Sequence, residues 1–440
     1  MSHGADPAKA HKDVAYVQDV ARSEADVKVA NFEDENMIAP RSPIYLSHAP
    51  TPKIKDFALL AALEAGIRGT LLSVMPVYIY RAFPNAAEVS HIYFLVGLAS
   101  LCCGLMVPWL SQMIPRRWMF TLAGCCYLVG LALAITEIPT LMACALLVNA
   151  IGTVIYTICL NAYVLDYIHR MDLGRNETTR MVYSAVPWMV GPILGVTLLN
   201  WWTPAPFILA GVFALLLIAV FWKLRLGNGK QISRARAPAV NPLAYLGRFF
   251  AQPRLIAGWF FAVMRSCGWW VFVVYLPIYC IESGLGDRVG AMALSVSNGL
   301  LFTTPLMLRK VNQAGVRWSV RASFASCALL FALGWALSGY PWATVISIMA
   351  ASIFLVALDV CGGLPFLMAV RPAERTEMAA VYSSFRDVSG ILTPGAAALV
   401  LLIAPVSGIF AACAMGMGVG WFVAGQLHPR LGLNRANAAQ

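Results

Sequence analysis

Charged residues are scarce in this chain: Asp, Glu, Lys and Arg make up only 12% of its 440 residues. A soluble globular protein usually carries about 25%. Hydrophobic residues account for 60%, and they gather in runs close to the roughly 20 residues that a helix needs to cross a bilayer. A soluble protein of two or three domains is therefore excluded, and we expect the chain to cross a membrane many times.

Signatures of enzymes are missing as well. The sequence contains no P-loop, no HExxH and no GxSxG, so it predicts neither an enzyme nor ATP-driven transport by this chain alone. The eleven cysteines all fall inside apolar runs and show neither CxxC nor Cys/His metal spacing. We interpret them as small buried apolar side chains, and we expect no cofactor and no metal.

Twelve apolar runs are long enough to be membrane spans, with six on each side of a basic central loop. They cover residues 57–80, 90–111, 117–136, 139–168, 181–200, 205–224, 255–281, 287–308, 317–338, 341–370, 383–404 and 406–427. The expected domains are a largely disordered cytoplasmic N-terminal tail, a first six-helix bundle, the central loop, a second six-helix bundle and a cytoplasmic C-terminal tail. Their boundaries are 1–55, 56–226, 227–254, 255–428 and 429–440.

The basic residues outside these runs are unevenly distributed. Nearly all Lys and Arg lie on the side that also receives both tails and the central loop, whereas the other side receives only Arg81 and Arg288. Positive loops stay in the cytoplasm, so both termini are expected there and the protein is expected in the inner (plasma) membrane. The net charge of +11 is explained by contact with anionic membrane lipid; no nucleic-acid partner is expected.

An internal repeat relates the two halves. "VYS" at 182–184 recurs at 381–383, "QMIPRRW" at 112–118 lines up with "NQAGVRW" at 312–318, and Asn161 lines up with Asp359. Arg68 followed by Tyr78 lines up with Arg265 followed by Tyr275. Because each half has an even number of spans, both copies have the same orientation. The fold class expected is an all-α polytopic membrane protein with twelve transmembrane helices in two pseudo-symmetric six-helix bundles.

Over about residues 56–428 the sequence resembles the major facilitator superfamily. The six-plus-six spans and the basic central loop carry the resemblance, while the motifs are degenerate. "PWLSQMIPRR" at 108–117 keeps only Arg116 and Arg117 of the family's loop motif, and "LLVNAIG" has Asn149 in place of an arginine linked to proton coupling. The resemblance implies alternating access, with a solute site near the midplane between the bundles.

A further match is "VGPILG", which contains Gly191, Pro192 and Gly195 of a motif common in exporters. Small residues let two helices approach closely in lipid, and a proline followed by a glycine bends a span. This helix-packing motif is open to two interpretations, plain packing of helices or a role in coupling.

Four charged residues lie deep in the apolar runs: Glu64, Arg68, Arg265 and Asp359. Each costs about 2.5–3.5 kcal/mol at the centre of a span on insertion scales. Glu64 and Arg68 share one helix face and either neutralise each other or set up an anion site, because spans 1 and 7 of the family face each other and would bring Arg68 and Arg265 together. Matched arginines there resemble the organophosphate/phosphate exchangers of the superfamily.

The remaining candidates have more than one interpretation. Asp359 is either the structural partner of an arginine, with Arg265 as the candidate, or a proton carrier. We interpret Arg386 and Asp387 as gating or anchoring residues rather than as substrate contacts. The candidate substrate-binding residues are Arg68, Arg265, Glu64, Tyr78, Tyr275 and Trp269. The candidate coupling or gating residues are Asp359, Asn161, Asp166, Arg386 and Asp387.

Together these features predict a monomeric secondary active transporter that moves a small organic solute, preferably an anion or a zwitterion, with a proton or a counter-anion as the coupling partner. Two alternatives remain: an exporter of amphiphilic or drug-like compounds, and a non-transporting relative that acts as an assembly factor or a sensor.

Overall fold

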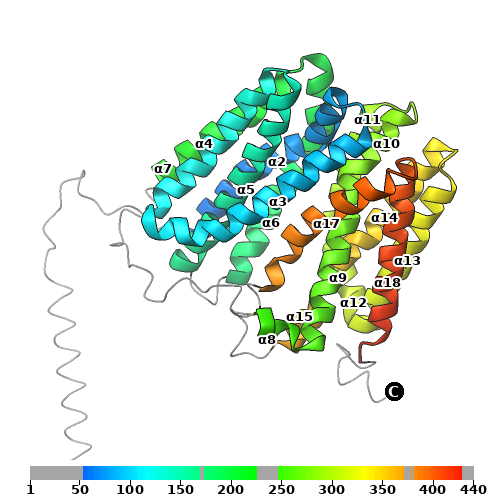
Figure 1. Cartoon of the computed structure of the whole chain (residues 1–440). Coiled ribbons are helices and arrows are strands. Elements are labelled where there is room, and N and C mark those ends of the chain that lie inside the picture. The colour runs from blue at the N-terminus through cyan, green and yellow to red at the C-terminus, as the bar shows by residue number, and fades with distance from the viewer. Residues whose placement is uncertain (1–52, 169–172, 225–245, 371–377, 379–380, 429–440) are drawn as a thin grey trace, which may run out of the picture. The chain divides into compact units, whose positions relative to one another are not determined.

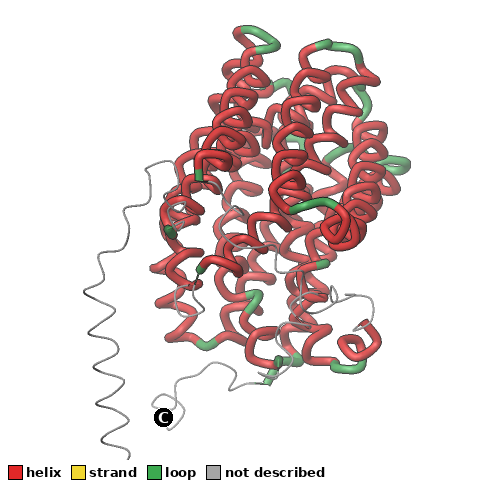
Figure 2. The backbone as a smooth tube through the Cα atoms, turned by 90° about the vertical axis from the view of Figure 1, so that its left-hand side faces the viewer, coloured by secondary structure: helices red, strands yellow, loops and turns green. Residues whose placement is uncertain are grey.

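The computed structural model describes residues 53–168, 173–224, 246–370, 378 and 381–428. The chain divides into two units, Met1–Ala49 and Pro50–Gln440, and all the described residues belong to the second. Within that part of the chain every regular element is a helix, and short loops join the helices (Figure 2). Most of the predicted N-terminal tail, the predicted C-terminal tail and most of the predicted central loop lie outside the described residues; the last residues of the N-terminal tail belong to the first helix, which begins at Ile54.

Six helices form the first half. They are α2 (Ile54–Ala82), α3 (Ala86–Met113), α4 (Arg116–Ile135), α5 (Pro139–Tyr167), α6 (Leu173–Trp201) and α7 (Ala205–Lys223). The helices of the second half are interrupted more often than those of the first. It comprises α8 (Leu246–Phe250), α9 (Pro253–Trp270), η4 (Val271–Tyr275), α10 (Leu276–Glu282), α11 (Asp287–Gly299), η5 (Leu300–Thr303), α12 (Thr304–Ala314), α13 (Val316–Ala336), α14 (Pro341–Cys361), α15 (Leu364–Ala369), α17 (Phe385–Val400) and α18 (Ser407–Gly425).

Eleven helical segments in the described residues are long and apolar enough to cross a membrane. They coincide with eleven of the twelve expected runs. The exception is the run at 383–404, where α17 has only 16 residues, because a turn at Ser384 precedes it and further turns follow Val400. The chain is a multi-pass membrane protein, and the expected number of spans is approximately confirmed.

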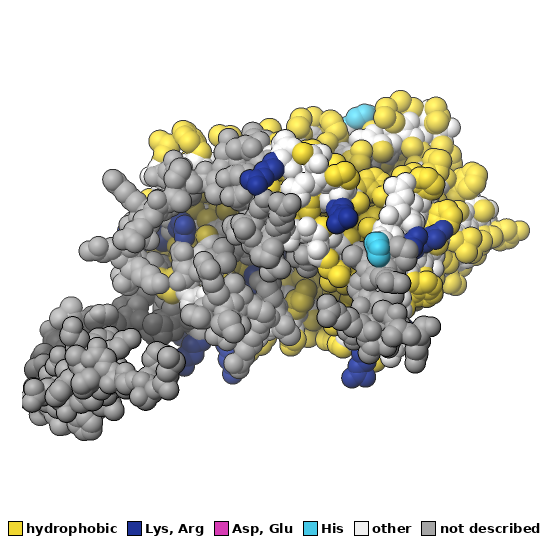
Figure 3. All heavy atoms as spheres, turned by 90° about the horizontal axis from the view of Figure 1, so that it is seen from below, with side chains coloured by type: hydrophobic (Ala, Val, Ile, Leu, Met, Phe, Trp, Pro, Cys, Tyr) yellow, Lys and Arg dark blue, Asp and Glu magenta, His cyan; other side chains and the backbone are white. Residues whose placement is uncertain are grey.

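The two ends of the helices differ in charge. At the end that we call the basic end, helices begin or end near Arg116, Lys223, Arg254 and Arg317. Seen from that end, the described side chains include Lys and Arg but no visible Asp or Glu (Figure 3). The opposite end carries Arg81, Glu282 and Asp287 near its loops.

Close glycine contacts join α2 to α6. A Cβ added at Gly191 would lie 2.4 Å from the carbonyl carbon of Gly69, and one at Gly195 would lie 2.3 Å from the carbonyl oxygen of Thr70. Only glycine permits this approach of two backbones. The hydroxyl of Ser73 adds a hydrogen bond to the carbonyl of Pro192 at 2.9 Å. The motif at 191–195 therefore sets the distance between these two helices.

Pro192 also contributes to the contact between the halves. A proline has no N–H, so it leaves the carbonyl four residues earlier without its helical partner. That carbonyl belongs to Trp188, and Asn298 of α11 donates to it at 2.8 Å. The proline in α6 thus leaves an acceptor for the second half.

Further hydrogen bonds join the halves towards the opposite end. Ser90 bonds to Tyr275 at 2.9 Å, and Tyr80 donates to Glu282 at 3.0 Å. Arg81 forms an ion pair with Asp287, and Asn200 contacts both side chains. In Figure 1 the two groups of helices converge near α10 and α11 and diverge towards the end where α8 and α15 lie. The described conformation is therefore closed at the opposite end.

The end of the predicted central loop is structured. Leu246–Phe250 forms the short helix α8, and its buried Phe249 packs with Leu255 and Phe366. The segment 246–252 therefore lies against α9 and α15 rather than forming a free loop, because burial of the Phe249 ring is favourable.

Candidate functional site

Glu64 and Arg68 lie at the middle of α2. Arg68 Nη1 is 3.4 Å from Glu64 Oε1, and the Arg68 side chain is 43% exposed whereas that of Glu64 is 10% exposed. The guanidinium lies 5.1 Å from the centroid of the Trp188 ring, and the Tyr127 hydroxyl is 3.5 Å from Glu64 Oε1. An exposed cation halfway along a largely buried span indicates water-accessible space inside the protein, because a cation that faces lipid at that depth is costly.

Arg265 finds its acidic partner on another helix. Its Nε lies 3.1 Å from Asp359 Oδ1 of α14, although the N–H is not aligned for a hydrogen bond. The other carboxylate oxygen, Oδ2, accepts a hydrogen bond of 2.9 Å from the Trp269 indole. Asp359 is 34% exposed and Arg265 is 14% exposed. The carboxylate thus contacts two donors of α9 and still meets solvent.

Arg386 lies in the first turn of α17 and is exposed. It interacts electrostatically with Arg68 and Arg265 as well as with Asp359, so guanidinium groups of both halves act on one region. The Phe385 ring contacts two of these arginines. Its centroid lies 5.2 Å from the guanidinium carbon of Arg265 and 5.6 Å from that of Arg386. No ion pair among the described residues holds Arg386. Asp387 beside it is half-buried and interacts with it electrostatically.

The other polar candidates gather nearer the basic end. Asn161 is exposed on α5, and its Oδ1 accepts a bond of 3.5 Å from Arg180 of α6. Arg180 also interacts electrostatically with Glu64. The side chain of Asp166 lies outside the described residues.

Tyr78 and Tyr275 are both buried, and their hydroxyls are occupied by protein. Tyr78 donates to the Ala134 carbonyl at 2.6 Å, where α4 ends. In the second half the matching contact is made by Tyr279, which donates to the Ser338 carbonyl at 2.9 Å, just beyond α13. The π-helix η4 lies between Arg265 and this contact, and Tyr275 contacts Ser90 of the first half instead.

Tyr127 looks like an ordinary apolar residue of a span in the sequence, and only its contact with Glu64 distinguishes it. Trp188, whose ring lies beside the Arg68 guanidinium, is one of several aromatic residues that the sequence offers as cavity walls. Arg180 stands just before the apolar run at 181–200, and it interacts electrostatically with Glu64.

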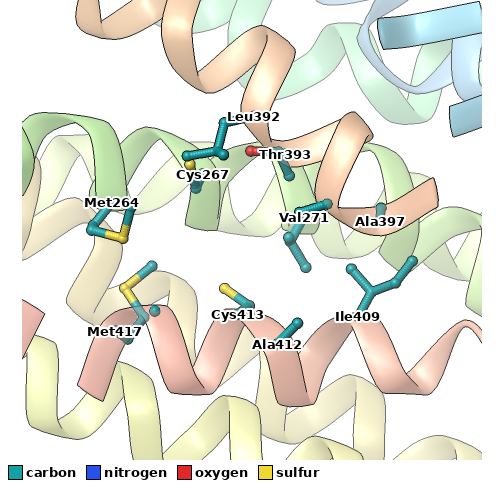
Figure 4. Close-up of a pocket in the computed structure, with 12 residues that line it drawn as sticks. Met264, Cys267, Val271, Leu392, Thr393, Ala397, Ile409, Ala412, Cys413 and Met417 are labelled. Atoms are coloured by element: carbon teal, nitrogen blue, oxygen red, sulfur yellow. The ribbon is translucent and has the colours of Figure 1, made fainter. Parts of the chain in front are cut away.

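A separate apolar cavity of about 200 Å³ lies in the second half between α9, η4, α17 and α18 (Figure 4). The sulfur-bearing side chains of Met264, Cys267, Cys413 and Met417 line it. Thr393 also lines it; its Oγ1 is buried without a hydrogen-bond partner of normal geometry and interacts with the thiol of Cys267, which is a weak hydrogen-bonding group.

Replacing Thr393 by valine is expected to stabilise the protein by about 1 kcal/mol, because an unsatisfied buried hydroxyl costs about 1–3 kcal/mol and valine has nearly the same shape. Thermal unfolding of the detergent-purified protein measures the change. Thr393→Ser, which keeps the hydroxyl and loses the methyl, should unfold at a lower temperature than wild type. A melting temperature of Thr393→Val below that of wild type would contradict the account.

Among the described residues no group of three or more His, Cys, Asp and Glu side chains is arranged to hold a metal ion. The charged groups of the candidate site are the guanidinium and carboxylate groups described above, with aromatic side chains such as Trp188 and Trp269 beside them.

These features define a class: a polytopic helical membrane protein in two halves, with charged, water-accessible residues at midspan. The family model described as Major Facilitator Superfamily matches residues 57–394, well over half of the chain. The chain belongs to the major facilitator superfamily and is a membrane transporter. A search of curated proteins gives no match.

Solved structures of transporters share the fold. A variant of the nucleoside transporter NupG aligns with a TM-score of 0.64 at 14% identity, over 84% of this chain and 98% of that chain. A bacterial homologue of the iron transporter ferroportin, in an inward-facing state, gives 0.66 at 12% identity over 85% and 98%. A POT family transporter in complex with a thioalcohol conjugated peptide gives 0.66 at 11% identity over 84% and 94%.

Proposed function

We propose that the chain is a secondary active transporter that moves a small organic anion or zwitterion across the inner membrane by alternating access. The observation that carries the proposal is the electrostatic interaction among guanidinium groups of both halves. Arg68 of the first half acts electrostatically on Arg386 of the second, and Arg386 acts on Arg265. A site shared by both halves is what alternating access requires.

Charge balance supports an anionic group on the solute. Guanidinium groups stay charged at any physiological pH and form paired donors that fit carboxylate or phosphate. Glu64 offsets Arg68 and Asp359 offsets Arg265, while Arg386 is held in no ion pair of the described residues. We assign the principal anion contacts to Arg386 and Arg68, whose guanidinium groups meet solvent, and a supporting role to Arg265.

Coupling follows from the same arrangement. A solute anion that approaches Arg265 competes with Asp359 for the guanidinium. A carboxylate that loses its cationic partner in the membrane interior gains from taking up a proton. Asp359 would therefore couple solute binding to a proton, and a counter-anion that replaces the solute would reset the same pair. Trp269, which holds the second oxygen of Asp359, would keep the carboxylate in place.

Orientation completes the proposal. We place the basic end, both tails and the central loop in the cytoplasm, because positive loops are retained there; the face in Figure 3 has this character. The hydrogen bonds and the Arg81–Asp287 ion pair at the opposite end then close the protein towards the outside. We propose that the transporter works as a monomer, since each chain contains both halves.

The solute class rests on the site and not on the fold. The similar structures carry titles that name a nucleoside transporter, a homologue of an iron transporter and a peptide complex. Proteins of one fold thus carry chemically different solutes. Our proposal of an anionic or zwitterionic solute rests on the arginines of this chain.

The test is a thermal-shift screen of the detergent-purified protein against anionic, zwitterionic and cationic metabolites. A ligand that binds the folded state raises the melting temperature by mass action. We expect one anionic or zwitterionic class to stabilise wild type and to bind Arg68→Gln and Arg386→Gln at least tenfold more weakly, because a hydrogen bond to a charged group contributes about 1.5–3 kcal/mol.

Arg309→Gln is the matched control, since Arg309 is exposed in the middle of α12 and its loss removes the same charge elsewhere. Stabilisation by cations that is equal in wild type and in both variants would end the anion proposal and favour an exporter of amphiphilic compounds.

A further inference from the structure

A second cavity, of about 260 Å³, lies at the basic end between α13 and α18. It is lined by Trp318, Arg321, Ala322, Ala325 and Trp421. Both helices are candidate membrane spans, and Trp318 is 65% exposed. The groove therefore lies on the outer side of the second half, at the depth where a span enters the membrane.

The groove carries positive charge without a carboxylate. The Arg321 guanidinium lies 4.8 Å from the centroid of the Trp421 ring, and Arg321 takes part in no ion pair of the described residues. Arg317, one turn earlier, donates to the carbonyl of Gly425 at the end of α18. Two guanidinium groups thus face the same helix end, and neither meets an acidic side chain there.

An arginine between two tryptophans at this depth matches the chemistry of a lipid headgroup. An uncompensated guanidinium inside a span is costly, and a phosphodiester at the membrane surface supplies the missing charge. Tryptophan rings are favoured at the same depth, because the ring contacts lipid while the indole N–H can reach water. Ala322 and Ala325 have short side chains, which leave room for an acyl chain along α13.

We propose that this groove binds an anionic phospholipid, with Arg321 contacting the phosphate, Trp318 and Trp421 flanking the headgroup, and an acyl chain lying over Ala322 and Ala325. The site is separate from the proposed solute site, because Arg68, Arg265 and Arg386 lie on α2, α9 and α17. It extends the proposed function and does not depend on it.

Native mass spectrometry of the full-length protein tests the proposal. The detergent-purified protein is incubated with palmitoyl-oleoyl phosphatidylglycerol or with the corresponding phosphatidylcholine, and the bound lipid is counted. We expect wild type to retain phosphatidylglycerol at least fivefold better than Arg321→Gln, and better than it retains phosphatidylcholine. Arg309→Gln, which loses the same charge at the same end but outside the groove, should behave like wild type.

A second variant addresses the apolar part of the groove while keeping the charge. Ala325→Leu fills the space for the chain and should also lower the retention of phosphatidylglycerol, provided that the variant elutes as a monodisperse peak. Inorganic phosphate at millimolar concentration should not displace the lipid. Equal retention in wild type and Arg321→Gln, an equal loss in Arg309→Gln, or displacement by inorganic phosphate would overturn the proposal.

Discussion

Replacing Gly195 by alanine is expected to destabilise the folded protein by about 1–3 kcal/mol, the usual cost of forcing a methyl group into a packed interior. The added Cβ would lie 2.3 Å from the Thr70 carbonyl oxygen and 2.8 Å from Val74 Cγ2. A backbone oxygen cannot turn aside as a flexible side chain can, so α2 and α6 must move apart. Because α2 carries Glu64 and Arg68, the same displacement should also lower transport.

Gly211→Ala is the matched control, since a Cβ at Gly211 meets nothing within 4 Å. Alanine is a better helix former than glycine by about 1 kcal/mol, so this variant should be as stable as wild type or more so. Melting temperatures and the monodisperse fraction after purification compare the two. Similar losses in Gly195→Ala and Gly211→Ala would show that the contact between α2 and α6 is not the cause.

The second large effect is expected at the pair formed by Arg265 and Asp359. Arg265→Met leaves the Asp359 carboxylate with Trp269 as its donor and removes a cation from the proposed solute site. Removing one partner of a fully buried ion pair costs about 3–5 kcal/mol. The carboxylate here is 34% exposed, so we expect a loss of about 2 kcal/mol once solvent screening is included, together with loss of transport.

The double variant Arg265→Met/Asp359→Leu separates the two effects. Apolar residues in place of a buried ion pair are often neutral for stability, so the double variant should melt near wild type. Transport in proteoliposomes, measured with the anion that stabilises wild type, should stay absent. A double variant as unstable as Arg265→Met would mean that the unpaired carboxylate does not cause the instability. If the double variant transports the anion, neither Arg265 nor Asp359 is required for the mechanism.

Several features could be predicted from the sequence because they depend on short-range spacing. An apolar run of about 20 residues has few alternatives to a membrane-spanning helix. Eleven of the predicted runs are confirmed as helices of sufficient length. Glu64 and Arg68 contact each other because residues four apart lie on one helix face. The resemblance to the major facilitator superfamily is confirmed by the match over residues 57–394.

The contacts between helices depend on more than spacing along the chain. No acid stands three or four residues from Arg265; Asp359 of α14, which the sequence offers as a partner of an arginine, forms the pair. The repeat paired Tyr78 with Tyr275, yet Tyr279 makes the matching hydrogen bond. A π-helix, Val271–Tyr275, interrupts the span just before this contact, and the spacing of the repeat does not reveal it.

The sequence by itself therefore determined the membrane helices, their grouping into two related halves and the charges placed deep within them. Only the tertiary structure decided which charges of different helices interact: Asp359 pairs with Arg265, and Arg386 interacts electrostatically with Arg68 and Arg265. The physical reason is that apolar periodicity encodes a helix locally. The rotation and separation of neighbouring helices depend instead on close contacts, such as those of Gly69 and Gly191, that form only when distant segments pack together.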